Sequence, residues 1–369
     1  MKIVNRLIKK IDYTLLIAVL IVCVFGVITI SSATSSLSAG NERFIRTQTV
    51  SIFMGLAAIS IILLFDYKTF ARFHIPIYIL SNAMLIAVLL FGTGRDQWGA
   101  NRWISIAGFG FQPSEFAKIG VAISIAKIVA DNKENIHKIS TLLKVIFYVS
   151  LPIGLVVVQP DLGTSLTFVF FTFGILFAAG LRYKHIFIAG VTGLLSMPMV
   201  WTFLEHYQKT RIRVFLNPES DPMGAGYQIL QSKLAIGSGM LTGKGLYEGI
   251  QTQFGFLPER QTDFIFSVIA EELGFIGVVF LITMFIFILL KCIKIAREAK
   301  DDFGAYLVIG LTFMLAFHIF GNIAMTIGLM PVTGKPLPFV SYGGTFMLSN
   351  MIAIGLILNV NMRKDLINF

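Results

Sequence analysis

The chain has 369 residues, of which 56% are hydrophobic and only 14% are charged, and its formal net charge is +10. Soluble domains carry about 25% charged residues, so this composition excludes a soluble globular protein and indicates an integral membrane protein. The basic residues lie in short segments beside apolar runs and on no basic helix with interleaved aromatics, which excludes nucleic-acid binding and is typical of topology signals and of contacts with membrane lipids.

The apolar runs predict the fold class. Four basic residues precede the first run, Thr14 to Ile30, and this arrangement resembles a signal peptide. The run is about as long as a membrane span, however, and many more follow, so we interpret it as an uncleaved first helix. The sequence therefore predicts an all-α integral membrane protein with ten transmembrane helices, at 14–33, 48–66, 74–92, 114–130, 142–159, 162–180, 186–204, 264–291, 304–330 and 342–361.

Short basic segments recur at alternate ends of these spans. By the positive-inside rule this side is cytoplasmic, which places both termini inside the cell. One long extracytoplasmic loop, 205–263, then joins helices 7 and 8, and a shorter outside segment, about 93–113, carries Trp98, Arg102 and Trp103. We find no repeat and no separate soluble domain, so residues 1–369 are expected to form one membrane domain. The basic segments carry Lys68 and Arg72; Lys133 and Lys138; Arg182 and Lys184; Lys291, Lys294, Arg297 and Lys300; and Arg363 and Lys364.

Ionisable residues within spans are costly and usually paired or functional. The fourth span opens with SEFAK, in which Ser114 can cap the helix and Glu115 and Lys118 share one face and can form an ion pair. This pair either orients the helix or lines a polar cavity. In QPDLGTS (159–165), Pro160 breaks the apolar run, and Asp161 either caps the next helix or also faces a substrate.

The stretch PERQTDFIFSVIAEE (258–272) is the most informative. It places Asp263 where the long loop enters an apolar helix, so its carboxylate can meet a polar, lipid-linked substrate and have its pKa raised by partial burial. Glu271, eight residues later, is expected close to the same face. Glu271 and Glu272 either take part in function or pair with a basic residue of another helix.

Three further segments carry polar or irregular backbone. Segment 211–245 is predicted to form a short interfacial helix and a tight turn, and its basic residues can hold either a diphosphate or anionic headgroups. Segment 330–345 has three prolines and three glycines, and irregular backbone at membrane depth must line a cavity or be buried, so we expect it against the same cavity as Asp263. His318 and Asn322 are predicted to form hydrogen bonds between helices.

Several of these motifs, in order and spread over most of the chain, resemble the SEDS family of bacterial cell-wall polymerases. Residues 327–345 are more similar to its rod-shape members than to its division members. The motifs are NRWISIAGFGFQPSEFAK (101–118), QPDLGTS, RIRVFLNP (211–218), GAGYQILQSKLAIGSG (224–239), GFLPERQTDFIFSVIAEELGFIG (255–277) and MPVTGKPLPFVSYGGT (330–345).

The resemblance implies a ten-helix SEDS fold and a peptidoglycan glycosyltransferase that joins lipid II units. It implies a place in the inner (cytoplasmic) membrane with the active site on the extracytoplasmic side. It also implies a class B penicillin-binding protein and the elongation machinery as partners. The family's essential acidic residue falls on Asp263 and its supporting charged pair on Glu115 and Lys118. Other residues that match family motif positions are Asp161, Arg102, Arg211, Lys233, Glu271 and Ser341.

The chemistry suggests a role for each group. Asp263 can act as general base for the acceptor hydroxyl, or as a ligand of a divalent cation such as Mg²⁺ or Mn²⁺. Basic residues can hold the diphosphate, and Arg102, Arg211, Arg213 and Lys233 are the candidates. Two other functions stay open at this stage: a lipid II flippase, which also needs a polar cavity, and a scaffold that only docks a penicillin-binding protein.

Overall fold

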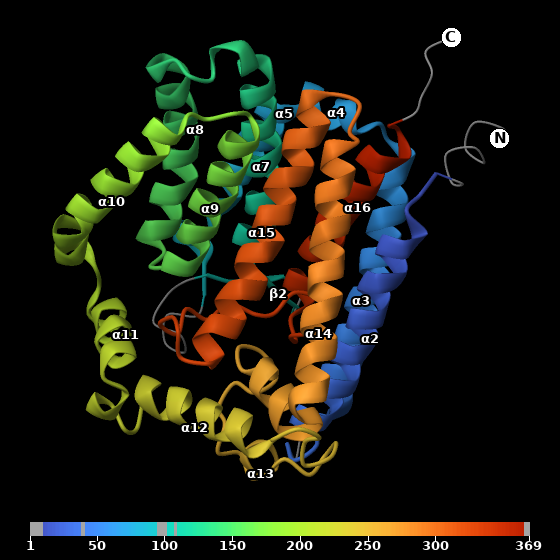
Figure 1. Cartoon of the computed structure of the whole chain (residues 1–369), viewed down its shortest axis with the longest axis vertical. Helices are drawn as coiled ribbons and strands as arrows, with labels where there is room; N and C mark the ends of the chain where they lie inside the picture. Colours follow the sequence, from blue (N-terminus) through green and yellow to red (C-terminus); the bar gives the residue numbers. More distant parts are fainter. Residues whose placement is uncertain (1–9, 38–40, 94–101, 107–108, 365–369) are drawn as a thin grey trace.

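The structure, a computed structural model, describes residues 10–37, 41–93, 102–106 and 109–364. Within them, ten long helices lie where the ten spans were predicted (Figure 1). Eight are long and apolar enough to cross a membrane; of the other two, α7 carries four charged residues near its ends and α9 has only 17 residues. Lys2, Arg6, Lys9 and Trp98 lie outside the described residues. The ten helices are α2 (Tyr13–Thr34), α3 (Asn41–Leu64), α5 (His74–Phe91), α7 (Pro113–Asp131), α8 (Ile139–Val158), α9 (Leu162–Ala178), α10 (Tyr183–Phe203), α14 (Ile265–Arg297), α15 (Asp302–Thr326) and α16 (Gly344–Met362).

Aspartate side chains cap the starts of α2, α9 and α15, and one predicted cap needs correction. The Asp161 carboxylate accepts a hydrogen bond from the Thr164 backbone N–H at 3.0 Å, as predicted for the cap of α9. The prediction that Ser114 caps α7 is wrong: the N-cap is Gln112, without a side-chain hydrogen bond. Pro113 explains the difference, because its fixed φ suits the first helical position, which places the N-cap two residues before Ser114.

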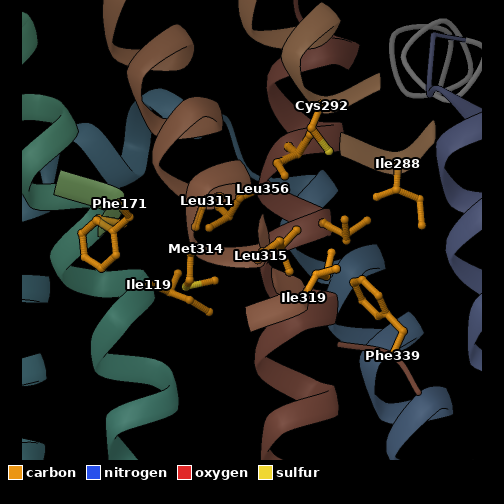
Figure 2. Packing of buried hydrophobic residues seen from close by; sticks show 14 of the residues in the cluster. Ile119, Phe171, Ile288, Cys292, Leu311, Met314, Leu315, Ile319, Phe339 and Leu356 are labelled. Carbon is orange, nitrogen blue, oxygen red and sulfur yellow. The ribbon is translucent and has the colours of Figure 1, made fainter. Parts of the chain in front are cut away.

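The core is centred on α15. Leu311, Met314, Leu315 and Ile319 of this helix project among side chains of α7, α9, α14 and α16 (Figure 2). This explains why α15 is apolar all round, since it contacts α7, α9, α14 and α16 and has little surface left for lipid. Helix α10 is the opposite case: its side chains are largely exposed, and it lies at the edge of the bundle (Figure 1).

A small sheet departs from the all-α prediction. Strands β1 (Ile104–Ile106) and β2 (Phe109–Phe111) pair antiparallel, with Ile104 opposite Phe111. They lie in the segment predicted to connect the third and fourth spans. β-branched and aromatic residues favour such strands, but three-residue strands are too short to give a periodic signal in sequence.

The two ends of the bundle differ. Both described ends of the chain lie at one end, which we call the termini end, and the segment between α10 and α14 lies at the other, the loop end (Figure 1). The predicted basic segments gather at the termini end with α4 (Tyr67–Arg72), where ion pairs join Lys68 to Asp301 at 3.4 Å and Lys133 to Asp302 at 2.6 Å. The loop-end segment contains α11 (His206–Leu216), the 3₁₀ helix η2 (Pro218–Ser220), α12 (Ala225–Ser238) and α13 (Ile250–Gln253).

Helix α14 is interrupted near the loop end. Gly274 has φ 62° and ψ −161°, a conformation that is essentially restricted to glycine. The turn after α12 satisfies backbone groups at the break: Phe275 N–H donates to the Met240 carbonyl at 2.9 Å, and Lys244 N–H donates to the Glu271 carbonyl at 2.9 Å. The long loop and the membrane helix are therefore one hydrogen-bonded unit at this point.

Candidate active site at the loop end

Asp263 lies in the turn that precedes α14, and the surrounding backbone holds it firmly. Its carbonyl accepts a hydrogen bond from Asn322 Nδ2 of α15 at 2.8 Å, and the same amide donates to the Lys335 carbonyl at 2.7 Å. The preceding residue is also fixed, because the Ser341 hydroxyl donates to the Thr262 carbonyl at 2.6 Å. Segment 330–343 thus packs against Asp263, as predicted, and Ser341 acts through the backbone.

The side chain of Asp263 faces a mixed electrostatic environment. Burial, reinforced by the nearby Glu259 carboxylate, raises its pKa to about 6, although Arg211, Lys335 and Arg102 oppose the rise. Its Oδ2 lies beside Gly334, where an added Cβ would be 3.4 Å away. A half-buried carboxylate with a pKa near neutrality suits a group that takes up and releases protons.

Asp161 is also acidic but has the opposite character. It is buried and forms an ion pair with Lys335 at 3.3 Å, and Lys335 also donates to the Thr164 hydroxyl. Burial alone would raise the pKa of Asp161, but Lys335, Arg102 and the hydrogen bonds from Thr164 hold it well below its usual range. Asp161 therefore stays ionised, whereas Asp263 can exchange a proton near neutral pH, so the two carboxylates suit different roles.

A cavity of about 150 Å³ opens beside these groups. Arg102 and Arg211 both line it, and Arg102 Nη2 donates to the Pro160 carbonyl at 2.5 Å. Gln208 and Arg211 are three residues apart on α11 and both face the cavity, and a capping box of Glu205 and Gln208 fixes the start of that helix. Asp263 is adjacent but is not among the lining residues, which are Arg102, Asp161, Leu162, Gly163, Leu166, Gln208, Arg211, Ile212, Met330, Pro331, Val332 and Thr333.

Two predicted diphosphate ligands lie elsewhere. The Arg213 guanidinium stacks 6.0 Å from the ring centre of Trp201, and Arg213 does not line the cavity. Lys233 is exposed on α12, and its aliphatic stem lies against Gly328. The structure therefore brings Arg102 and Arg211 together at the cavity and separates Arg213 and Lys233 from it.

Glu115 and Lys118 form the predicted pair, and it is almost fully buried. Lys118 Nζ lies 2.9 Å from Glu115 Oε2, and it also contacts His318 Nε2 of α15 at 2.9 Å. The Ser349 hydroxyl of α16 donates to Glu115 at 3.2 Å. The pair thus joins α7, α15 and α16, and the predicted interhelical role of His318 is confirmed.

Glu271 does not share the surroundings of Asp263, contrary to the helical spacing. Its carboxylate accepts hydrogen bonds from the Gln251 N–H at 2.7 Å and from the Thr252 N–H and hydroxyl at 3.1 and 2.7 Å. Glu272 accepts from Ser32 at 2.7 Å. Among the described residues neither carboxylate has an ion-pair partner, so these glutamates hold α13 and the end of α2 rather than a cation.

Sequence reasoning missed Lys335 as a member of the site. It is buried, pairs with Asp161 and adds positive charge near Asp263. A lone lysine inside the otherwise apolar, proline-rich VTGKPLPF was the available signal, because a buried lysine requires a partner.

Comparisons with known proteins agree with this architecture. A family model for FtsW, RodA and SpoVE, described as cell cycle protein, matches residues 13–366. The probable peptidoglycan glycosyltransferase FtsW of Trichlorobacter lovleyi is 40% identical, over 95% of this chain and 93% of that protein. The peptidoglycan glycosyltransferase MrdB of Escherichia coli K12 is 38% identical, over 97% and 95%.

A solved structure extends the likeness to three dimensions. A chain of a peptidoglycan synthase complex, described as coordinating polymerization and crosslinking, superposes with a TM-score of 0.82 at 29% identity, covering 97% of this chain and 99% of that one. The family model and the relatives span nearly the whole chain. The chain therefore belongs to the FtsW, RodA and SpoVE family of cell cycle proteins.

Proposed function

We propose that this integral membrane protein is a peptidoglycan glycosyltransferase that polymerises lipid II into glycan strands. The observation that carries the proposal is the placement of Asp263, a half-buried carboxylate with a raised pKa, near the positive charges of Arg211 and Lys335 at the loop end. The names of the relatives, each a peptidoglycan glycosyltransferase, support the same reaction.

Each bond change has a candidate group. The acceptor sugar's 4-hydroxyl loses its proton to the Asp263 carboxylate as its oxygen bonds to C1 of the donor sugar. The bond between C1 and the diphosphate oxygen breaks, and undecaprenyl diphosphate leaves with the electron pair. Arg102 and Arg211, which line the cavity, stabilise the negative charge of the leaving group.

Alternatively, Asp263 acts as a ligand of a divalent cation. The described residues include no cluster of three or more metal-binding side chains. Mg²⁺ in phosphate chemistry is often held by one or two carboxylates together with the substrate's phosphates, so Asp263 alone fits such an ion when the diphosphate is present. The cation would then supply positive charge to the leaving group, beside Arg102 and Arg211.

The remaining roles follow from the placement of the site. We place the loop end outside the cell and both termini in the cytoplasm, since lysines and arginines gather at the termini end. A class B penicillin-binding protein is the proposed partner, supported by the synthase complex to which this fold is similar. We assign the chain to elongation because residues 327–345 are more similar to the rod-shape members of the family. Relatives of both types match the chain, so complementation of a rod-shape mutant and of a division mutant would distinguish elongation from division.

Polymerisation by the purified chain with its partner transpeptidase tests the proposal. Lipid II is supplied with penicillin present to block crosslinking, and wild type is compared with Asp263→Asn. We expect long uncrosslinked strands from the wild type and a loss of about 10²- to 10⁴-fold in the variant. Full activity of Asp263→Asn would reject both roles of this residue. Absence of polymer from an intact wild-type complex, with lipid II moving across vesicles, would instead indicate a flippase.

A further inference from the structure

A second cavity lies at the termini end, on the opposite side of the bundle from Asp263. Its volume is about 470 Å³, within the roughly 300–1,000 Å³ range of ligand pockets. The glycosyl transfer proposed above gives it no role. It is lined by Lys10, Ile11, Asp12, Tyr13, Thr14, Lys291, Lys294, Ile295, Glu298, Asn361 and Lys364.

Its lining carries more positive than negative charge: four lysines and two carboxylates. Lys291 lies 3.5 Å from Asp12, while Lys294 and Lys364 share Glu298, at 3.8 and 2.5 Å. The ammonium groups of Lys291, Lys294 and Lys364 thus form ion pairs with only two carboxylates. An added anion at this cavity would offset part of the excess positive charge of its lining.

The cavity is formed where three helices end. The start of α2 meets the last turns of α14 and α16, and Asn361 Nδ2 of α16 donates to the Lys10 carbonyl at 3.3 Å. Asp12 caps α2 by accepting from the Leu15 N–H at 3.1 Å. The lysines therefore come from segments far apart in sequence that the fold holds together.

Apolar side chains continue from the cavity along the bundle. On α2, Tyr13 and Ile17 are 46% and 54% exposed, and on α14, Phe287 and Leu290 are 40% and 60% exposed. Lys291 Nζ lies 5.7 Å from the centre of the Phe287 ring, so one lysine spans the polar and apolar parts. A ligand that fits this surface has an anionic head and apolar chains.

We propose that the termini-end cavity binds the phosphate headgroup of an anionic phospholipid, with its acyl chains lying along the exposed faces of α2 and α14. Basic pockets between membrane helices on the cytoplasmic side suit anionic headgroups. A free phosphate shares the head chemistry, but only a lipid uses the apolar surface. A bound lipid would join the three helix ends and stabilise this corner of the bundle.

Native mass spectrometry of the full chain in a neutral detergent tests the proposal. The protein is titrated with dioleoyl phosphatidylglycerol, with dioleoyl phosphatidylcholine and with glycerol 3-phosphate. We expect one phosphatidylglycerol molecule to bind saturably, and phosphatidylcholine and glycerol 3-phosphate to bind much more weakly. Each lysine near a membrane surface contributes about 5-fold in affinity, so Lys291→Gln with Lys364→Gln is expected to weaken binding on the order of 25-fold.

The matched control is Lys68→Gln with Lys133→Gln, which removes two ion-paired lysines of the same end that lie outside the cavity. This control should bind phosphatidylglycerol as the wild type does. If the double variant fails to fold, Lys294→Gln replaces it; its lysine is 66% exposed, and we expect about 5-fold weaker binding. Three results would each overturn the proposal: phosphatidylcholine binding as tightly as phosphatidylglycerol, the control variant losing as much affinity as the test variant, or glycerol 3-phosphate binding as tightly as phosphatidylglycerol.

Discussion

Replacing Lys118 by methionine would leave the Glu115 carboxylate buried with only the Ser349 hydroxyl, 3.2 Å away, as its partner in the described part of the chain. Both charged side chains are almost inaccessible, at 1% and 4% exposure. Unit charges 2.9 Å apart attract by about 6 kcal/mol at an effective dielectric constant of about 20. Burial of both charges offsets part of this, so removal of one partner should cost about 3–5 kcal/mol.

Thermal unfolding of four purified proteins measures this effect: wild type, Lys118→Met, Glu115→Leu and the double variant. We expect each single variant to be strongly destabilised and the double variant to lose far less than the sum, because it leaves no unpaired charge. Polymerisation of lipid II by the double variant then shows whether the pair also shapes the site. Additive losses would refute the reasoning, since they would mean that the two charges do not interact.

Four further changes test other parts of the structure. Since a general base acts when ionised, the polymerisation rate should rise with pH through about 6, the pKa of Asp263, and level off above it; a flat profile would contradict the assignment. Asn322→Leu removes the donor to one buried carbonyl, of Lys335, and one partly buried carbonyl, of Asp263, and should cost about 1–3 kcal/mol in unfolding, a value that an unchanged midpoint would exclude. Gly274→Ala should destabilise by at least about 1–3 kcal/mol, because its φ strains alanine and the added Cβ would lie 2.3 Å from the Gly243 nitrogen, whereas Gly237→Ala, where a Cβ meets nothing within 4 Å, should be neutral or stabilising; similar midpoints would contradict both reasons. Glu271→Gln should speed hydrogen exchange at the amides of α13, and unchanged exchange would show that the carboxylate does not hold them.

The ten long helices were predictable because their signals are local. An apolar run of about 20 residues between polar segments determines a span, and basic residues at alternate ends determine its direction. Cap chemistry is local too, and Asp161 was identified as a cap from its position after Pro160. The β1–β2 hairpin was missed because its strands are three residues each, which is too short for a periodic pattern.

The candidate site was only partly predictable, because its contacts are set by the tertiary fold. Lys335 pairs with Asp161, which is more than 170 residues away, and no spacing connects the two. Glu271 was expected on the face of Asp263 by helical period, but α14 begins only at Ile265, so that period does not extend back to Asp263. The carboxylate of Glu271 binds the amides of α13 because the interruption at Gly274 places the loop beside it.

The interruption at Gly274 also determines how α14 can match the thickness of a bilayer. All 33 residues of the helix would extend about 50 Å, whereas the hydrocarbon core is about 30 Å thick. The 23 residues from Phe275 to Arg297 extend about 34 Å, so the part after Gly274 is long enough to cross the core by itself. The first two turns, with Glu271 and Glu272, can then lie at headgroup depth, where hydrogen bonds from α13 and from Ser32 satisfy the two buried carboxylates.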